Sequence, residues 1–430
     1  MTFHLHAPRR APISTPMHDR FFVMLLWLWF FLGPLRGAGA ATPVTLSETD
    51  VVRLALKRSP ASVVAKATDE LAFARSETAN PLPNPTLEWA RETVDSGPAS
   101  ARGSQDLFFA TMPLDLAKPL SSRAVAASEA AWWGADAALS RSDGVLQAVL
   151  AYYSLVLVGR HVVVMERSVA ALEEATRVLH KREAAGSASG YESARLTVAR
   201  ELGRSRLAEA RGDMKAARVH LAALLALDPE SLSVTTELEL VDAPASDLWI
   251  NSRGERRASL AKAAQSLDSA ENAASRSKWT WLPSLEISGG LKRANTFGLD
   301  NGFGYVLGAA LDVPLFDRGQ QERSLADAQV TLARARKEAL ERRITAEIST
   351  AGSAYVVARD ELIRFESQTS NPIETLLAAA VSGYRDGERS IVELLDAQRA
   401  RTEVEERRLE LLGNAKRAEA RLRAAVGVLQ

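Results

Sequence analysis

Proline is absent from the chain between Pro119 and Pro229, and this gap constrains the fold more than any other feature. From Leu120 to Ala184, alanine, leucine and valine recur at spacings of three and four, the period of an amphipathic helix. The pattern predicts one helix over residues 118–184, with a length of about 100 Å at ~1.5 Å per residue. An isolated helix of that length cannot bury its apolar stripe, so it needs coiled-coil partners.

The partner helix follows directly in the sequence. Residues 186–190 read GSASG and interrupt the helical pattern, which then resumes over residues 190–227. We therefore expect an antiparallel helical hairpin.

The same order of elements occurs twice. A shift of 201 residues (387 − 186 = 201) aligns residues 186–227 with 387–428 without a gap, and about 12 of 42 positions are identical. A period of this length indicates a duplicated half-protein, with repeats at 41–240 and 241–430. The second repeat has its long helix at 318–384 and its return helix at 390–429, and Pro372 predicts a kink near Asn371.

Each repeat opens with a helical pattern, at residues 49–80 and 251–280, and Ser47 with Asp50 predicts a capping box for the first. A β-hairpin follows in each repeat, at residues 85–114 and 283–315.

The strands of these hairpins alternate between apolar and small or polar residues. One predicted face carries Leu87, Trp89, Leu285, Ile287, Leu291, Tyr305, Leu307, Ala309, Leu311 and Val313. Strands of about 10 residues suffice to cross a bilayer when tilted, although a soluble hairpin would show the same pattern. Four strands cannot close a barrel, and an open edge cannot lie in lipid. Either the strands are soluble or three chains pool them into twelve.

The N-terminus has the layout of a secretory signal peptide. Residues Phe21 to Leu35 form an apolar run of about 15 residues, too short for a membrane-spanning helix, after Arg9, Arg10 and Arg20. Ala38-Gly39-Ala40 is a predicted cleavage site, which gives a signal peptide at 1–40 that starts at Met1 or Met17. No later apolar run reaches about 18 residues, so we expect no membrane-spanning helix in the mature chain.

Composition argues against several function classes. The 53 basic and 53 acidic residues cancel, so no nucleic acid partner is indicated. There is no cysteine, and the mature histidines His161, His180 and His220 lack metal-ligand spacing. No nucleophile elbow, phosphate loop or HExxH motif occurs. We expect neither enzymatic activity nor a cofactor or metal site.

The order of signal peptide, helix, β-hairpin, long helix, tip turn and return helix resembles the TolC-like outer-membrane efflux protein family over the whole mature chain. The segment from Gly383 to Gln398, GYRDGERSIVELLDAQ, is similar to that family's second tip motif. PLPNPTL from Pro81 and VPLFDRGQ from Val313 are similar to the heavy-metal branch, the outer-membrane partners of cobalt, zinc and cadmium exporters.

The resemblance implies a mainly α protein with a small β part: long antiparallel coiled-coil helices in a trimeric α-barrel, and four strands per chain in a 12-stranded outer-membrane β-barrel. It implies a passive exit duct in the outer membrane that extends into the periplasm. Its partners would be two further copies of itself, outer-membrane lipid, a periplasmic adaptor protein and an inner-membrane efflux pump. Heavy-metal cations are the candidate cargo.

The resemblance also assigns residues at the periplasmic tip. A gate would consist of Tyr384 and Arg389 on the second hairpin, Glu192 and Tyr191 on the first, and Glu393 with Asp396 as an acidic ring. The adaptor-docking tips would be Gly186, Ser187, Ala188, Gly387, Glu388 and Ser390. Without the resemblance, each of these is equally a plain interhelical turn or a solvated charge.

The alternative function is an exported soluble periplasmic coiled-coil protein with a structural or adaptor-like role. It explains the helices, but it gives no reason for an apolar face on both hairpins.

Overall fold

The computed structural model of the chain describes residues 44–77, 83–98, 102–115, 118–184, 186, 189–234, 238, 257–296 and 302–429. The predicted signal peptide and the predicted tip residues Ser187 and Ala188 lie outside the described residues. Residues 45–430 form one compact unit, which is the unit described below.

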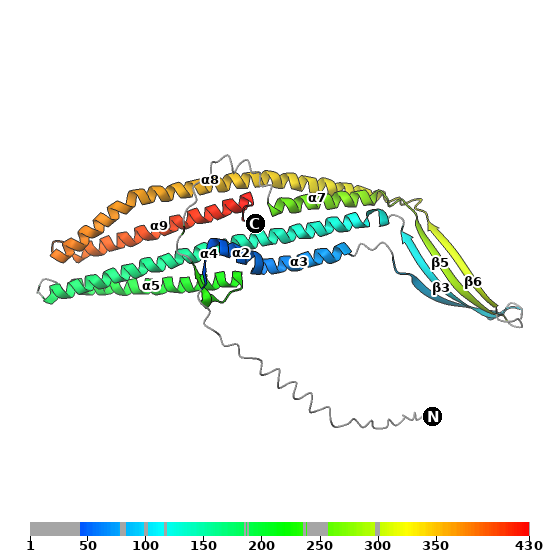
Figure 1. Ribbon diagram of the computed structural model, residues 1–430, viewed down its shortest axis with the longest axis horizontal. Helices are drawn as coiled ribbons and strands as arrows, with labels where there is room; N and C mark the ends of the chain where they lie inside the picture. The colour runs from blue at the N-terminus through cyan, green and yellow to red at the C-terminus, as the bar shows by residue number, and fades with distance from the viewer. Residues whose placement is uncertain are drawn as a thin grey trace, which may run out of the picture. The chain divides into compact units, whose positions relative to one another are not determined.

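Two long helical hairpins make up most of the described chain (Figure 1). The first joins α4 (Lys118–Ala184) to α5 (Gly190–Leu225), and the second joins α8 (Gln320–Asp386) to α9 (Ile391–Val426). The long arms have 67 residues each and the return arms 36 each. Helix α9 also packs against α4, so the two hairpins lie side by side.

The helix that opens each half packs near the strand end of the long arms. The first half has two helices, α2 (Glu48–Arg58) and α3 (Pro60–Glu77), and α7 (Ala258–Ser277) takes this place in the second. The helical pattern predicted over residues 49–80 is thus divided between two helices, and residues 78–80 lie outside the described residues. Proline disfavours a helical conformation in the preceding residue, and Ser59 is extended with ψ 149°. The capping box at Ser47 and Asp50 is confirmed.

The largest buried core surrounds the middle of α4. The uncharged run 145–158, VLQAVLAYYSLVLV, packs against α2, α5 and the end of α9. By length and composition alone, α4 is apolar enough to cross a membrane, whereas the sequence analysis expected no membrane-spanning helix. Just over half of its apolar window is buried against these neighbours, as in the core helix of a bundle.

A polar network crosses this core and links the two halves of the chain. The Tyr153 hydroxyl on α4 donates a hydrogen bond to Glu48 Oε2 on α2 at 2.7 Å, and Arg423 on α9 pairs with Glu48. Lys416 and Glu419 form an ion pair at 2.9 Å, and each side chain is only 4% exposed. Both residues lie on α9, and removal of either one would leave the other as an unpaired buried charge.

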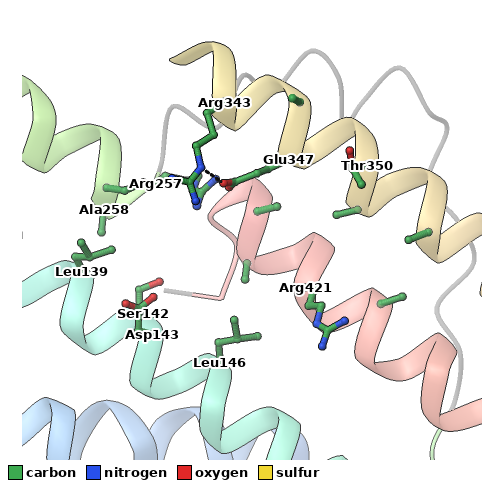
Figure 2. A pocket seen from close by; sticks show the side chains of 17 residues that line it. Leu139, Ser142, Asp143, Leu146, Arg257, Ala258, Arg343, Glu347, Thr350 and Arg421 are labelled. Carbon is green, nitrogen blue, oxygen red and sulfur yellow. Dashed lines mark hydrogen bonds and ion pairs between the residues drawn. The ribbon is translucent and has the colours of Figure 1, made fainter. Parts of the chain in front are cut away.

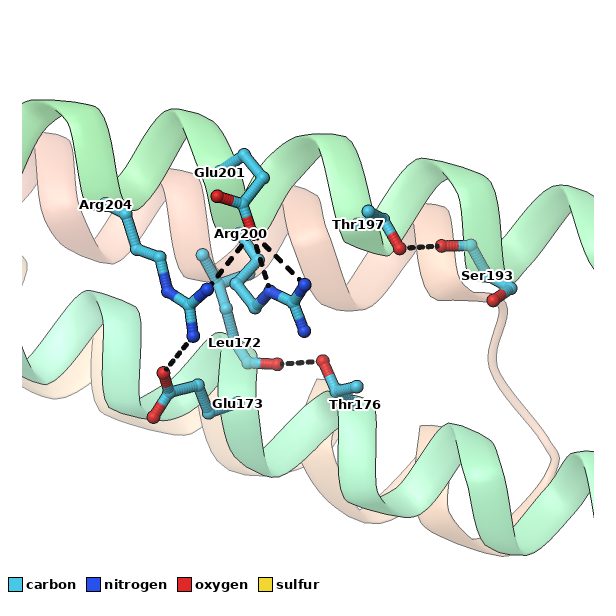
Figure 3. A network of polar contacts seen from close by, with 8 residues as sticks. All are labelled: Leu172, Glu173, Thr176, Ser193, Thr197, Arg200, Glu201 and Arg204. Carbon is cyan, nitrogen blue, oxygen red and sulfur yellow. Dashed lines mark hydrogen bonds and ion pairs between the residues drawn. The ribbon is translucent and has the colours of Figure 1, made fainter.

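The α4–α5 hairpin also carries ion pairs on its surface (Figure 3). Arg204 on α5 contacts Glu173 on α4 at 2.9 Å and Glu201 on its own helix at 3.2 Å. Exposed pairs of this kind contribute about 0 to 1 kcal/mol each. The buried leucines beneath them, Leu172, Leu179 and Leu196, account for more of the stability of the hairpin.

Four antiparallel strands form one sheet in the order β2-β3-β5-β6 (Figure 1). The strands are β2 (Thr86–Val94), β3 (Gly103–Asp115), β5 (Ser284–Thr296) and β6 (Gly302–Asp312). The central pairing of β3 with β5 joins the two predicted hairpins. Strands β2 and β6 are left as edges. A second, small sheet pairs β1 (Val44–Leu46) with β4 (Leu232–Val234), after the short 3₁₀ helix η2 (Pro229–Ser231).

Candidate functional site

One face of the four-stranded sheet is apolar and exposed. The register places Trp89, Phe108, Leu291 and Tyr305 opposite one another in a single row across all four strands. The next row contains Leu87, Ala110, Gly289 and Leu307, and directly opposed residues lie on the same face. Leu87 and Tyr305 are each 80% exposed and Leu307 is 78% exposed. An apolar surface of this extent needs a partner or a lipid environment.

The opposite face of the sheet carries mostly small and polar residues. One row on this face reads Thr86, Thr111, Ser288 and Gly308 across the strands. Glu88 and Glu286 lie on this face too, and both are exposed. The Phe109 ring lies against Gly290, where an added methyl group would come within 2.8 Å of the ring. This alternation is the pattern of strands that have lipid on one side and water on the other.

The apolar rows end at a charged row near the β-hairpin turns. Arg91 on β2 pairs with Asp106 on β3 through Nε to Oδ1 at 2.9 Å and Nη2 to Oδ2 at 3.0 Å. Arg293 lies opposite Asp106 on β5. These charged residues form one boundary of the apolar face.

At the other end of the long helices, both tip turns use glycine in the left-handed conformation. Gly186 has φ +72° and Gly387 has φ +81°. The N–H groups of Glu388 and Arg389 donate to the carbonyl of Gly383 at 2.8 and 2.9 Å and so satisfy the end of α8. Serine side chains then cap both return helices, with Ser189 accepting from Glu192 N–H and Ser390 from Glu393 N–H.

Tyr384 and Glu192, which the resemblance assigns to opposite hairpins, lie in one cluster. Tyr384 is 1% exposed and packs among Leu179, Leu196 and Ile391. Burial raises the pKa of the Tyr384 hydroxyl, and the nearby Glu192 carboxylate raises the pKa further. Among the described residues, neither the Tyr384 hydroxyl nor Glu192 Oε2 has a hydrogen-bond partner, although both atoms are buried.

The remaining predicted gate residues do not join this cluster between the hairpins. Arg389 Nη1 lies 3.5 Å from Glu393 Oε1, one turn away in sequence, and the Arg389 side chain lies over Gly383. Glu393 Oε2 accepts from Ser390 N–H at 2.8 Å, and this capping lowers the pKa of Glu393. Asp396 and Tyr191 are exposed, and the Tyr191 hydroxyl accepts from Arg195 at 2.8 Å. Thus Arg389 and Glu393 contact their own hairpin.

Sequence reasoning missed Arg182, near the end of α4. Its guanidinium carbon lies 4.8 Å from the centre of the Tyr384 ring, and Nη1 donates to the Tyr384 carbonyl oxygen at 3.4 Å. Spacing alone does not show which arginine faces a tyrosine 202 residues away. This contact joins the two hairpins at their ends.

A cavity of about 580 Å³ lies between α4, α7, α8 and α9, away from both the tip and the sheet (Figure 2). Glu347 on α8 accepts from Arg257 Nη1 at 2.6 Å and from Arg343 Nε at 2.7 Å at its wall. Asp143 and Arg421 are exposed at the opposite wall. Alanine is the commonest of the lining residues, and its small side chain leaves a gap in the helix packing with a charged rim.

Metal ligands do not gather anywhere in the described part of the chain: no group of three or more His, Cys, Asp or Glu side chains forms there. His161 pairs with Glu406 at 3.2 Å and His180 with Glu183 at 3.1 Å, which are isolated contacts.

The long paired helices, the four-stranded sheet with one apolar face and the glycine turns at the tips are together typical of an outer-membrane channel protein. The family model described as outer membrane efflux protein matches residues 249–428. This match covers the second of the two halves of the chain. The chain is therefore an outer-membrane efflux protein. We set aside the alternative function of a soluble periplasmic coiled-coil protein.

Named relatives agree with this assignment. The cobalt-zinc-cadmium resistance protein CzcC of Cupriavidus metallidurans is 25% identical over 343 residues, which cover 78% of this chain and 79% of CzcC. Among solved structures, VceC of Vibrio cholerae is 17% identical with a TM-score of 0.69, and 88% of this chain and 96% of VceC are covered. The CmeC outer membrane channel of Campylobacter jejuni is 15% identical with a TM-score of 0.71, and the coverage is 90% and 89%. At these identities the two structures establish the fold.

Proposed function

We propose that three copies of this chain form a passive exit duct, in which pooled strands make a 12-stranded barrel and the helical hairpins make a periplasmic tunnel. The apolar face of the sheet carries this proposal. A single chain exposes Leu87, Tyr305 and Leu307 and leaves β2 and β6 as the two edge strands of its four-stranded sheet. Pairing with strands of further copies closes the barrel and satisfies the backbone N–H and C=O groups of the edge strands, and lipid covers the apolar face.

The duct receives its cargo from an inner-membrane pump through a periplasmic adaptor, and the adaptor docks at the hairpin tips. The turns around Gly186 and Gly387 favour this arrangement because an added side chain at either position would meet no atom within 4 Å. The tip surface therefore has room for a neighbouring helical hairpin. Glu388 and Ser390 are exposed beside Gly387 and belong to the same docking surface.

Divalent heavy-metal cations are the proposed cargo. The similarity to a cobalt-zinc-cadmium resistance protein over 78% of the chain supports this class. So does the polar face of the sheet, where Glu88 and Glu286 would face the lumen of a closed barrel. A duct selects by charge and diameter and performs no reaction on the cargo.

Two measurements test the duct and its cargo. The purified protein in planar bilayers should conduct ions and favour cations over anions, which the reversal potential in a salt gradient reports. Deletion of the gene in the source bacterium should raise cellular cobalt, zinc or cadmium, and the intact gene should restore the metal content. Absence of conductance would refute the duct, and unchanged content of all three metals would refute the cargo.

Arg389 tests the proposed gate within this function. In the trimer, Arg389 and the exposed Asp396 would face the axis, where neighbouring copies supply the contacts that one chain lacks. Arg389→Ser should raise the conductance of the closed channel, while Arg399→Ser, on the helix α9 that follows this turn, should not. Equal closed conductance in the wild type and Arg389→Ser would remove Arg389 from the gate.

A further inference from the structure

Near the tips, a single cation bridges the two helical hairpins. Arg182 lies in the last turn of α4, and Tyr384 lies in the last turn of α8. The guanidinium stacks over the Tyr384 ring at 4.8 Å and also donates to the Tyr384 carbonyl oxygen at 3.4 Å. One side chain on the first hairpin thus holds both the ring and the backbone of one residue on the second.

The surroundings strengthen this contact. Tyr384 is 1% exposed in an apolar cluster that includes Leu179 and Ile391, and Arg182 itself is half-buried. Removal of water strengthens the attraction between a cation and an aromatic face. The last carbonyls of a helix lack partners within the helix and carry partial negative charge, so a cation there is favourable for a second reason.

We propose that Arg182 is a latch residue, which holds the end of the second hairpin against the first and keeps the periplasmic tip closed. This inference rests on the proposed duct. It assigns to α4 a positioning residue that the tip motif on the second hairpin does not contain.

Arg389 is the obvious competitor for this role, and its geometry is different. It belongs to the second hairpin, pairs with Glu393 of that hairpin at 3.5 Å and covers Gly383. An arginine that contacts its own hairpin cannot hold the two hairpins of one subunit together. Arg182 makes the contact between hairpins, so within a subunit the latch is on the first hairpin.

The first test measures channel closure. A partly desolvated cation on an aromatic ring should shift the balance between joined and parted hairpins by about tenfold. Arg182→Ala should therefore raise the open fraction of the channel in planar bilayers by about tenfold. Arg182→Lys should restore part of the closure because it keeps the charge and loses the planar stack. The matched control is Arg177→Ala, on the same helix, whose arginine is 72% exposed and pairs with Glu174 in the same turn.

A double-mutant cycle separates the latch from general damage at the tip. In a Tyr384→Phe background the ring remains, so Arg182→Ala should keep its effect. In a Tyr384→Leu background the ring is gone, so most of that effect should disappear. Equal effects of Arg182→Ala in both backgrounds would overturn the stacking role.

The last measurement does not depend on conduction. The chain contains no cysteine, so spin labels can be attached at Lys181→Cys and Arg385→Cys, two exposed positions on opposite hairpins. Arg182→Ala should broaden the distance distribution toward longer values, and Arg177→Ala should leave it unchanged. An unchanged distribution in Arg182→Ala would refute the latch even if the channel conducts. A channel that never conducts but shows the broadened distribution would refute the duct and leave the contact between hairpins supported.

Discussion

Glu347 shows how a single carboxylate joins distant parts of this chain. It lies on α8 between Arg257, which precedes α7, and Arg343, one turn back on its own helix. Burial by itself would raise the pKa of Glu347, but hydrogen bonds and charge from the two arginines outweigh burial, and the net shift is downward. A carboxylate with a lowered pKa in the folded state stabilises the fold above its ordinary pKa, and this contribution is lost as pH falls.

Glu347→Gln should therefore destabilise the protein at neutral pH by about 1 kcal/mol, the scale of a partly exposed ion pair. The difference from wild type should persist down to about pH 4.3, the ordinary pKa of glutamate, and shrink below it. Thermal unfolding in detergent, followed by circular dichroism at several pH values, measures this difference. The control is Glu410→Gln, whose carboxylate is 57% exposed and pairs with Arg407 in its own helix. A difference that grows as the pH falls would contradict the assignment.

Residues at the tip were predictable only where a local pattern marks them. Gly387 and Ser390 stand out because a helix stop and a helix cap have sequence signatures, and the structure places them in those roles. Arg182 has no such signature, since its importance comes from the position of α8 beside α4. Glu393 was assigned to an acidic ring, yet its carboxylate also caps α9, a role that the Ser-x-x-Glu spacing encodes equally well.

The junction between the sheet and α8 depends on a turn that only glycine fits. Gly319 has φ +72°, and a methyl group added there would lie 1.8 Å from Thr280 Oγ1 and 2.7 Å from Thr280 Cβ. Gly186 has the same φ, but nothing lies within 4 Å of an added methyl group. The pair separates the effect of backbone conformation from that of steric crowding.

Gly186→Ala should cost about 1 kcal/mol, the penalty for a left-handed residue with a Cβ atom. Gly319→Ala should lower the free energy of unfolding clearly more, because the chain must also move away from Thr280. Adding Thr280→Ala to Gly319→Ala should restore part of the lost stability. Midpoints of chemical unfolding for the three variants provide the comparison. Equal midpoints for Gly186→Ala and Gly319→Ala would show that the crowding at Thr280 relaxes without cost.

The two faces of β6 can be compared with adjacent alanines. Ala309 lies beside Ile287 on the apolar face, and Ala310 lies beside Glu286 on the polar face. Both are exposed in the single chain. Ala309→Lys should cost about 2 to 4 kcal/mol because a lysine would lie in lipid. Ala310→Lys should be tolerated because Glu286 can pair with it. Yields of folded protein in lipid vesicles at increasing urea concentrations measure both, and a reversed order would reverse the assignment of the faces.

Among the elements, the long helices were the most predictable, because a continuous period over so many residues outweighs any local ambiguity. The break between α2 and α3 was missed although Pro60 is visible in the sequence. Proline is tolerated in the first turn of a helix, and Pro372 remains inside the continuous helix α8, so proline alone did not reveal which outcome applied.

For the whole molecule, the decisive pairing is the one between β3 and β5. Local sequence predicts each hairpin, but strand order depends on contacts between residues far apart in the chain, such as Phe108 with Leu291. That pairing leaves β2 and β6 as the edges. Because neighbouring strands alternate in direction through the sheet, β6 of one copy can pair antiparallel with β2 of the next.

Edge pairing between copies gives the last prediction. Glu88 on β2 and Gly304, Val306, Gly308 and Ala310 on β6 share the polar face of the sheet. Variants that combine Glu88→Cys with a cysteine at each β6 position in turn should reveal the register between copies, since the chain has no other cysteine. At the correct register, mild oxidation should link neighbouring copies, and a non-reducing gel should show species of one, two and three chains and none larger. A cysteine at Leu307, on the opposite face, should not link to position 88. Species that stop at two chains or continue beyond three would refute the trimer, because only closure after three copies leaves no free edge.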